Sequence, residues 1–158
     1  SMASTITASQ FSVEITEKLT LGGVKKGSRV VSIESSISEV ARRTMQVTYD
    51  TNGTSIMKFA STPATGTYDS DTFKYLRITN LDTTVSLVLQ LKEAGGQNVE
   101  VLIPAKKSFI LNSLAIDAEA DIDDAVMVTG SETLIDEILG KAASGSAVIE
   151  VEYIVVNT

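Results

Sequence analysis

The sequence predicts an all-β protein, an antiparallel β-sandwich of jelly-roll type with at most one or two short helices. Thr (18), Val (16) and Ile (14) make up close to a third of the 158 residues, and β-branched side chains favour a pleated sheet. Apolar and polar residues alternate in at least six segments separated by turn residues. The length fits one domain over residues 1–158. Ser1-Met2 is typical of residues left by cloning, and residues 1–5 are expected to be a flexible N-terminus.

The first quarter of the chain predicts two strands joined by a glycine turn. The segment 6–21 alternates loosely, with a bulge expected near Glu17-Lys18. Gly22-Gly23 ends it, and a second strand starts at 29–34. Residues 35–43 fit either a short helix with a capping box or a continuation of that second strand. Both interpretations remain open.

A hairpin is predicted around Asn52-Gly53, because Asn-Gly is a strong turn signal between alternating segments. Its two strands would be Met45–Tyr49 and Ser55–Phe59. The next segment, Ser61–Thr72, has no apolar periodicity and predicts a long exposed loop of the kind that carries contacts. Tyr68 within it fits either a contact residue or a side chain packed over its own loop.

The second half predicts a series of short strands. Residues 85–91 and 99–103 would form a hairpin through the turn at Gly95-Gly96. Ser131–Leu139 carries an N-cap, a helical apolar stripe and a following Gly140, so the local signals favour one or two turns of helix. Further strands are expected at 73–80, 108–111, 116–123, 126–128 and 148–156.

Charge and composition exclude several function classes. The net charge is -7, and residues 80–158 hold four basic and 13 acidic residues. An acidic surface repels phosphate backbones, so no nucleic-acid partner is expected. The basic doublets Lys25-Lys26, Arg42-Arg43 and Lys106-Lys107 are scattered and fit solvated surface or local ion pairs. No apolar run approaches the ~20 residues that span a bilayer, so no membrane partner is expected.

The chain has no His and no Cys. This removes Ser-His-Asp and Cys-His catalysis, zinc sites that use His or Cys, and disulfides. The glycine pairs open no dinucleotide-binding or phosphate-binding motif. We therefore expect no enzyme, no catalytic residue, no cofactor and no metal-binding residue.

One acidic segment remains a candidate for calcium. It fails the EF-hand pattern, because Ile122 and Val128 fall where Gly and Glu are needed. Alternation along a strand would also spread the carboxylates about 6–7 Å apart on one face. A solvated acidic face is the favoured interpretation, and a calcium site with a neighbouring loop is the alternative. The carboxylates are those of Asp117, Glu119, Asp121, Asp123 and Asp124.

Part of the chain resembles the small β-sandwich virion proteins of tailed bacteriophages. The resemblance lies in the stretches Tyr75–Leu81, Val85–Leu91, Val99–Pro104 and Ser108–Leu111, followed by a final strand at Ala147–Val156. It implies a structural role on the capsid or tail, as a decoration or fibre component, and a location in the virion after synthesis in the host cytoplasm. It also implies capsid or tail proteins as partners, and a strand where Ser131–Leu139 locally favours helix.

Three strands are apolar on both faces, which predicts self-association. Val88 and Leu102 fall opposite to the main apolar face of their strands, and Ile149 and Ile154 give the last strand a similar character. Such faces need a cover, from a flap of the same chain or from a neighbouring subunit. We expect a homo-oligomer, with a trimer favoured, formed through strand edges and the surface of 85–111 and 148–156.

Two other functions remain open. The first is a carbohydrate-binding or adhesin-like module that uses the Ser61–Thr72 loop, with or without calcium; the missing Trp counts against it. The second is a hydrolase with a carboxylate pair, which no motif supports.

Overall fold

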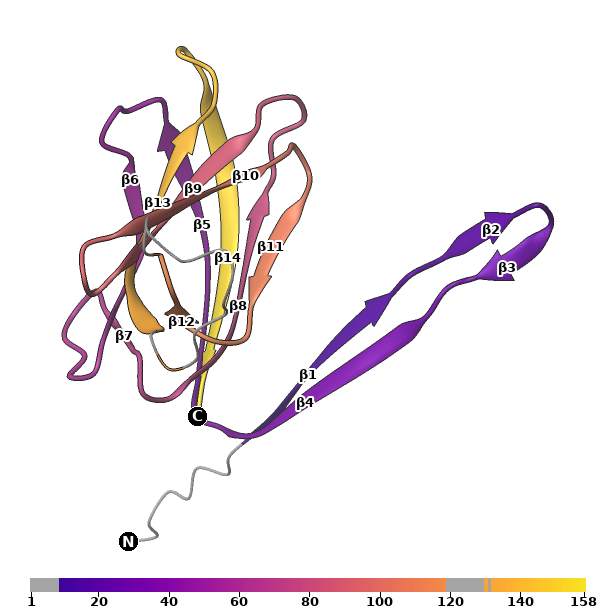
Figure 1. Ribbon diagram of the computed structural model, residues 1–158, viewed down its shortest axis with the longest axis horizontal. Coiled ribbons are helices and arrows are strands. Elements are labelled where there is room, and N and C mark those ends of the chain that lie inside the picture. Colours follow the sequence, from indigo (N-terminus) through magenta and orange to yellow (C-terminus); the bar gives the residue numbers. More distant parts are fainter. Residues whose placement is uncertain (1–8, 119–129, 131) are drawn as a thin grey trace, which may run out of the picture. The chain divides into compact units, whose positions relative to one another are not determined.

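The computed structural model describes residues 9–118, 130 and 132–158, and every regular element in that part of the chain is a β-strand (Figure 1). The predicted all-β class is confirmed. Contacts group the chain into two compact units, residues 1–39 with Thr158, and Val40–Asn157. The sandwich therefore occupies Val40–Asn157, a shorter span than the single domain over 1–158 that the sequence predicts. Residues 1–5 lie outside the described part.

The first unit is an N-terminal hairpin, defined here as Ser9–Ile37. It reverses at Gly22 and Gly23, whose φ values of 57° and 80° lie in the region that glycine enters at low cost. The bulge expected near Glu17-Lys18 is absent: pairing is interrupted there, but Thr16 opposite Arg29 and Leu19 opposite Lys26 keep the same register, and the register shift of this ribbon lies between Ser9 and Phe11. The strands are β1 (Ser9–Thr16) paired with β4 (Arg29–Ile37), and β2 (Leu19–Leu21) paired with β3 (Val24–Lys26).

Residues 35–43 belong to two strands, so the strand interpretation is confirmed and the helix alternative is wrong. β4 runs to Ile37, and β5 begins at Glu39. Ser36 takes a φ of 61°, a left-handed value that an α-helix does not allow.

The second unit is the sandwich, built from two sheets that share one hydrophobic core. The first sheet has the order β10-β9-β13-β6-β7, and the short β12 also pairs with β13. The second sheet has the order β11-β8-β14-β5. Pairing is antiparallel except between β6 and β7. The bounds are β5 (Glu39–Thr48), β6 (Thr54–Ala60), β7 (Tyr68–Asp69), β8 (Phe73–Asn80), β9 (Leu87–Glu93), β10 (Asn98–Ile103), β11 (Ser108–Leu111), β12 (Ala115–Ile116), β13 (Thr133–Ala142) and β14 (Val148–Asn157).

The predicted turn at Asn52-Gly53 forms, but the predicted hairpin does not. The Gly53 amide donates to the Asp50 carbonyl at 2.9 Å, and Gly53 has a φ of 74°. The flanking strands then enter different sheets, β5 beside β14 and β6 beside β13. The hairpin prediction is wrong because a local turn signal fixes the reversal of the chain and leaves the partner of each strand to the packing of the two sheets.

The predicted helix at Ser131–Leu139 is wrong: the segment enters a strand, β13 (Thr133–Ala142), and a register shift within it explains the helical signal. The register with β9 shifts between Ile135 and Glu137, and that with β6 shifts between Ile138 and Leu139. The shift beside Glu137 displaces the alternation of buried positions once, so that Ile135 and Ile138 both face the core although they are three residues apart, and strict alternation resumes from Ile138 to Gly140 and Ala142. Buried positions that are three and then two residues apart resemble the apolar stripe of a helix.

The remaining predicted strands agree with the structure where it describes them. β8 and β11 match the predicted bounds, and β9 pairs with β10 as the expected hairpin, with Leu89 opposite Val101. Pro104 directly follows the end of β10. The predicted strand at 116–123 is described only as far as 118 and contains the end of β12; the predicted strand at 126–128 lies outside the described residues.

The core lies between the two sheets. Leu89, Ile138 and Leu76 are fully enclosed and come from β9, β13 and β8. Phe59 of the first sheet meets Phe73 of the second edge-to-face, with ring centroids 5.7 Å apart. The buried side chains of both sheets belong to one hydrophobic cluster, which holds the two sheets together.

Candidate functional site

The acidic segment offers little to a metal in the part of the chain that the structure describes. Asp117 is half-buried, whereas Glu119, Asp121, Asp123 and Asp124 lie outside the described residues. Among described residues, no group of three or more Asp or Glu side chains is placed to hold a metal ion. No helix of the described chain is long and apolar enough to cross a membrane.

The Ser61–Thr72 segment is exposed in its first half and packed in its second. Tyr68 pairs with the end of β6, and its hydroxyl lies 2.9 Å from that of Tyr153 on β14. The Asn157 amide donates to the Asp69 carbonyl at 2.8 Å and so ties this segment to β14. The prediction of a wholly exposed loop is therefore wrong from Tyr68 onward, because the contact of half-buried Tyr68 with buried Tyr153 and the buried amide of Asn157 hold the segment against the sandwich.

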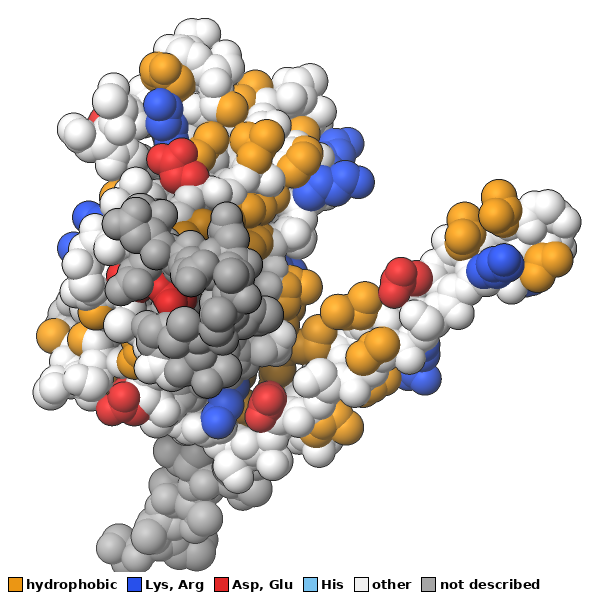
Figure 2. Space-filling view, in the orientation of Figure 1, with side chains coloured by type: hydrophobic (Ala, Val, Ile, Leu, Met, Phe, Trp, Pro, Cys, Tyr) orange, Lys and Arg blue, Asp and Glu red, His pale blue; other side chains and the backbone are white. Residues whose placement is uncertain are grey.

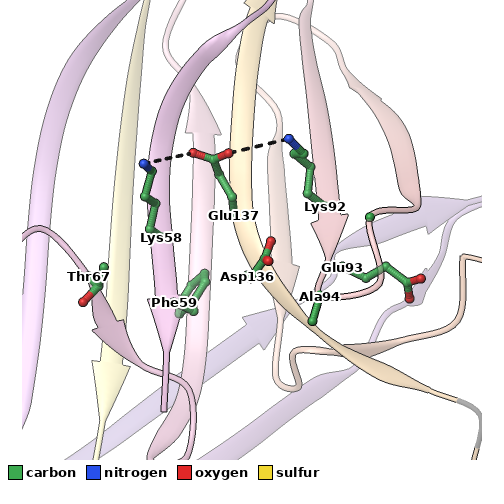
Figure 3. Close-up of a pocket in the computed structure, with 9 residues that line it drawn as sticks. Lys58, Phe59, Thr67, Lys92, Glu93, Ala94, Asp136 and Glu137 are labelled. Atoms are coloured by element: carbon green, nitrogen blue, oxygen red, sulfur yellow. Dashed lines mark ion pairs between the residues drawn. The ribbon is translucent and has the colours of Figure 1, made fainter. Parts of the chain in front are cut away.

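A polar cleft of about 420 Å³ opens on the first sheet, beside this segment (Figure 3). At its centre the Glu137 carboxylate lies between two ammonium groups, 3.7 Å from Lys58 and 4.0 Å from Lys92. The Ser55 hydroxyl also donates to Glu137 at 2.9 Å. The register explains this cluster, since Glu137 pairs with Lys58 on one side and with Lys92 on the other. The other residues that line the cleft are Phe59, Thr67, Glu93, Ala94, Gly96 and Asp136.

A register shift in β13 brings a second carboxylate to the same cleft. Ile135 pairs with Glu93 and Glu137 pairs with Lys92, which leaves Asp136 as the extra residue between them. An extra residue of this kind is a β-bulge, and it interrupts the alternation of side chains between the two faces of the strand. Asp136 and Glu137 therefore both line the cleft although they are neighbours in sequence.

The cleft can bind a polar ligand through ion pairs and hydrogen bonds. Its volume falls in the range of about 300–1,000 Å³ usual for small-molecule sites. Its lining is mostly charged, and Phe59, the aromatic residue that the structure places there, is buried rather than presented as a platform. No local sequence pattern points to this site, since Lys58, Lys92 and Glu137 come together only through strand pairing.

A buried asparagine organises the corner between β8 and β9. The Asn80 side-chain amide donates to the carbonyls of Val85 at 2.9 Å and Ile103 at 3.1 Å, and its oxygen accepts from the Asp82 amide at 3.0 Å. The Asp82 carboxylate then accepts from the amides of Val85 and Thr84, which lowers the pKa of Asp82.

Acid is expected to lower the stability of the sandwich by protonating two carboxylates, those of Glu152 and Asp82. The hydrogen bond from Arg77 lowers the pKa of Glu152 below its ordinary 4.5, and backbone amides lower that of Asp82 below 3.8. Both groups hold protons more weakly in the folded protein than in the unfolded chain. Their stabilisation is therefore complete above the ordinary values and is lost as the pH falls through the lowered ones.

The measurement is the urea midpoint at about pH 6 and about pH 3. The midpoint should fall on acidification, and the fall should be smaller in the double variant Glu152→Gln, Asp82→Asn. An equal fall in both proteins would show that these two carboxyls carry none of the acid sensitivity.

The N-terminal hairpin exposes an unusual amount of apolar surface (Figure 2). Apolar side chains occupy both faces, because Ile15 pairs with Val30 while Val31 pairs with Glu14 on the opposite face. Two-stranded ribbons are marginally stable by themselves. Seven large apolar side chains in the described hairpin have exposed fractions between 45% and 63%: Ile15, Leu19, Leu21, Val24, Val30, Val31 and Ile33.

Polar contacts hold the middle of the hairpin. The Arg29 guanidinium donates to both carboxylate oxygens of Glu14, at 2.7 and 3.1 Å, which lowers the pKa of Glu14. The Glu17 amide donates to the Ser28 carbonyl at 2.8 Å. At this point the backbones approach so closely that a Cβ added at Gly27 would lie 2.1 Å from the Glu17 carbonyl oxygen.

Gly27→Ala is therefore expected to disrupt the hairpin and leave the sandwich unchanged, because a backbone oxygen must move to admit the methyl group. Amide chemical shifts should change within residues 9–37, and trypsin should cleave faster at Lys18 and Arg29. Gly145→Ala is the matched control, since its added Cβ would lie 3.7 Å from the Tyr49 ring, an ordinary contact. Shifts spread through the sandwich, or none at all, would contradict this.

The surface predicted for self-association is exposed in part. Leu102 is 58% exposed and pairs with the half-buried Val88, so both do point away from the core. Ile149 is buried, and Ile154 is half-buried. The larger apolar surface is that of the hairpin, which sequence reasoning missed. Its signal was present in Val30-Val31 and Ile33, where neighbouring apolar residues face both sides of a strand.

Comparison with known proteins gave no relative: no family model, curated protein or solved structure matches this chain.

Proposed function

We propose that this chain is a structural protein of a tailed-bacteriophage particle that acts by assembling with itself and with capsid or tail proteins, without catalysis. The observation that carries the proposal is the exposed apolar surface of the N-terminal hairpin. A monomer that kept this surface in water would gain nothing from it, whereas burial between subunits would stabilise both the hairpin and the assembly.

The phage particle enters the proposal through the sequence resemblance. The stretches that resemble phage virion proteins correspond to β8 through β11 and to β14. All of them belong to the sandwich, so the resemblance concerns the body of the protein. The hairpin is the additional element through which such a body would join its neighbours.

Light scattering coupled to size exclusion tests the assembly. At a few tens of micromolar we expect a mass about three times the 16.8 kDa of one chain, as a trimer requires. A stable dimer would retain self-assembly and reject the trimer. A clean monomer would overturn the proposed mode of action.

Immunogold electron microscopy tests the location. Antibodies raised against the purified chain should label intact phage particles released from a lysogen or infected culture of the organism that encodes it. Particles that carry no label, in a lysate where the free protein is detected, would overturn the virion role.

A carbohydrate-binding or adhesin-like module is the second candidate, and the polar cleft beside Thr67 favours it. A glycan array read with and without calcium tests this candidate. Binding that is abolished by Lys92→Ala, but not by the equivalent change at the remote Lys74, would support it. An array without any signal in either buffer would eliminate it.

A further inference from the structure

We propose that the N-terminal hairpin is an exchanged arm that docks on the sandwich of a second copy of this chain. The inference rests on the proposed self-assembly and names the surface and the partner that produce it. The hairpin is the candidate because its apolar side chains are exposed on both faces, and because two strands cannot cover their own faces.

Charge points to a second copy as the partner. The distal hairpin, residues 18–29, carries Lys18, Lys25, Lys26 and Arg29 and no acidic residue. The sandwich, residues 40–157, holds nine basic and 16 acidic residues, a net charge of -7. The basic distal part of the hairpin and the acidic body are complementary, which favours association of unlike parts over pairing of two distal hairpins or two sandwiches.

The dimensions of the hairpin fit an interface of ordinary size. At about 3.3 Å per residue, the strand path from Ser9 to Leu21 runs for about 40 Å, and two strands make a ribbon about 10 Å wide. One face offers on the order of 400 Å² to the sandwich on which it lies, and both faces together approach the roughly 800 Å² that each partner loses in a standard interface. The sandwich exposes apolar groups that can receive it, including Leu102, Ile110 and Val148.

Mass measurement of hairpin variants provides the first test. The triple variant Leu19→Ser, Leu21→Ser, Val24→Ser removes apolar surface from exposed positions and should convert the assembly to a monomer of one-third the mass. The matched control Ser12→Ala, Thr20→Ser, Ser32→Ala alters the same hairpin at polar exposed positions and should keep the full mass. Circular dichroism and the urea midpoint of the sandwich should be unchanged in both.

The outcomes separate this inference from the proposed function. A monomeric wild-type protein overturns both. A wild-type assembly whose mass survives the triple variant overturns the exchanged arm and leaves self-assembly standing.

Cross-linking identifies the partner surface. Isotopically heavy and light chains are unfolded, mixed and refolded together, and a carbodiimide then joins amines to carboxylates in contact. We expect heavy-to-light links from Lys25 or Lys26 to carboxylates within residues 40–157. Links from these lysines that lie only within one chain, or only between two hairpins, would overturn docking on a second sandwich.

Discussion

Replacing Asn80 with Ala is expected to lower the free energy of unfolding by about 3 kcal/mol, because each buried polar group left without a partner costs ~1–3 kcal/mol. The side chain is fully buried and serves three backbone groups at once. The Val85 and Ile103 carbonyls would lose their donor, and the Asp82 amide would lose its acceptor. Ile103 ends β10, and Asp82 and Val85 lie in the turn that leads from β8 into β9, so the loss loosens the corner where these three strands meet.

Urea denaturation measures this effect, with Asn98→Ala as the matched control. Asn98 is the exposed first residue of β10, and its truncation should change the free energy of unfolding by less than about 0.5 kcal/mol. If the two alanine variants prove equally stable, the buried amide does not hold the corner.

Ile138→Ala is expected to cost about 3–4 kcal/mol, the range usual for removing a large side chain from a closed core. Ile138 is fully enclosed on β13, the strand that lies between β9 and β6. Its neighbours come from strands paired on both sides, so they cannot collapse easily into the space that it leaves.

Ile110→Ala, on the edge strand β11, is the control for that experiment. Its side chain is partly exposed, so its truncation removes less buried surface and leaves no closed cavity. Thermal unfolding should rank the wild type first, Ile110→Ala next and Ile138→Ala last by a wide margin. Equal losses of thermal stability in the two variants would mean that the side chains around Ile138 move into the vacated space and leave no cavity.

The positions of the sandwich strands along the chain can be predicted from the sequence more clearly than which strands pair with one another. The pairing of β9 with β10 was predictable because one short turn joins two alternating strands, and proximity in the chain fixes their register. The turn at Asn52-Gly53 was equally clear, but the two strands it joins belong to different sheets. Which sheet a strand enters depends on packing between segments far apart in the chain, and no local pattern records it.

The candidate sites were harder to predict for the same reason. Glu137 meets Lys58 and Lys92 only because β13 lies between β6 and β9. The register shift between Ile135 and Glu137, which places Asp136 at the cleft, also makes the burial pattern of β13 resemble that of a helix. For the N-terminal hairpin, alternation predicted strands correctly, yet it could not say whether the faces of those strands are covered or exposed.

The position of the last two strands in the sheets determines when the protein can fold. β13 lies between β9 and β6, and β14 lies between β8 and β5, so each sheet has an interior strand that is synthesised after its neighbours. During translation β5, β6, β8 and β9 are synthesised before the strands that pair with their edges. Unpaired strand edges are prone to wrong pairing and aggregation. The sandwich closes only when residue 157 has been made, so its folding depends on long-range contacts and is correspondingly slow. The N-terminal hairpin pairs only with itself and is the first described element to leave the ribosome, so it can form before the body of its own chain exists.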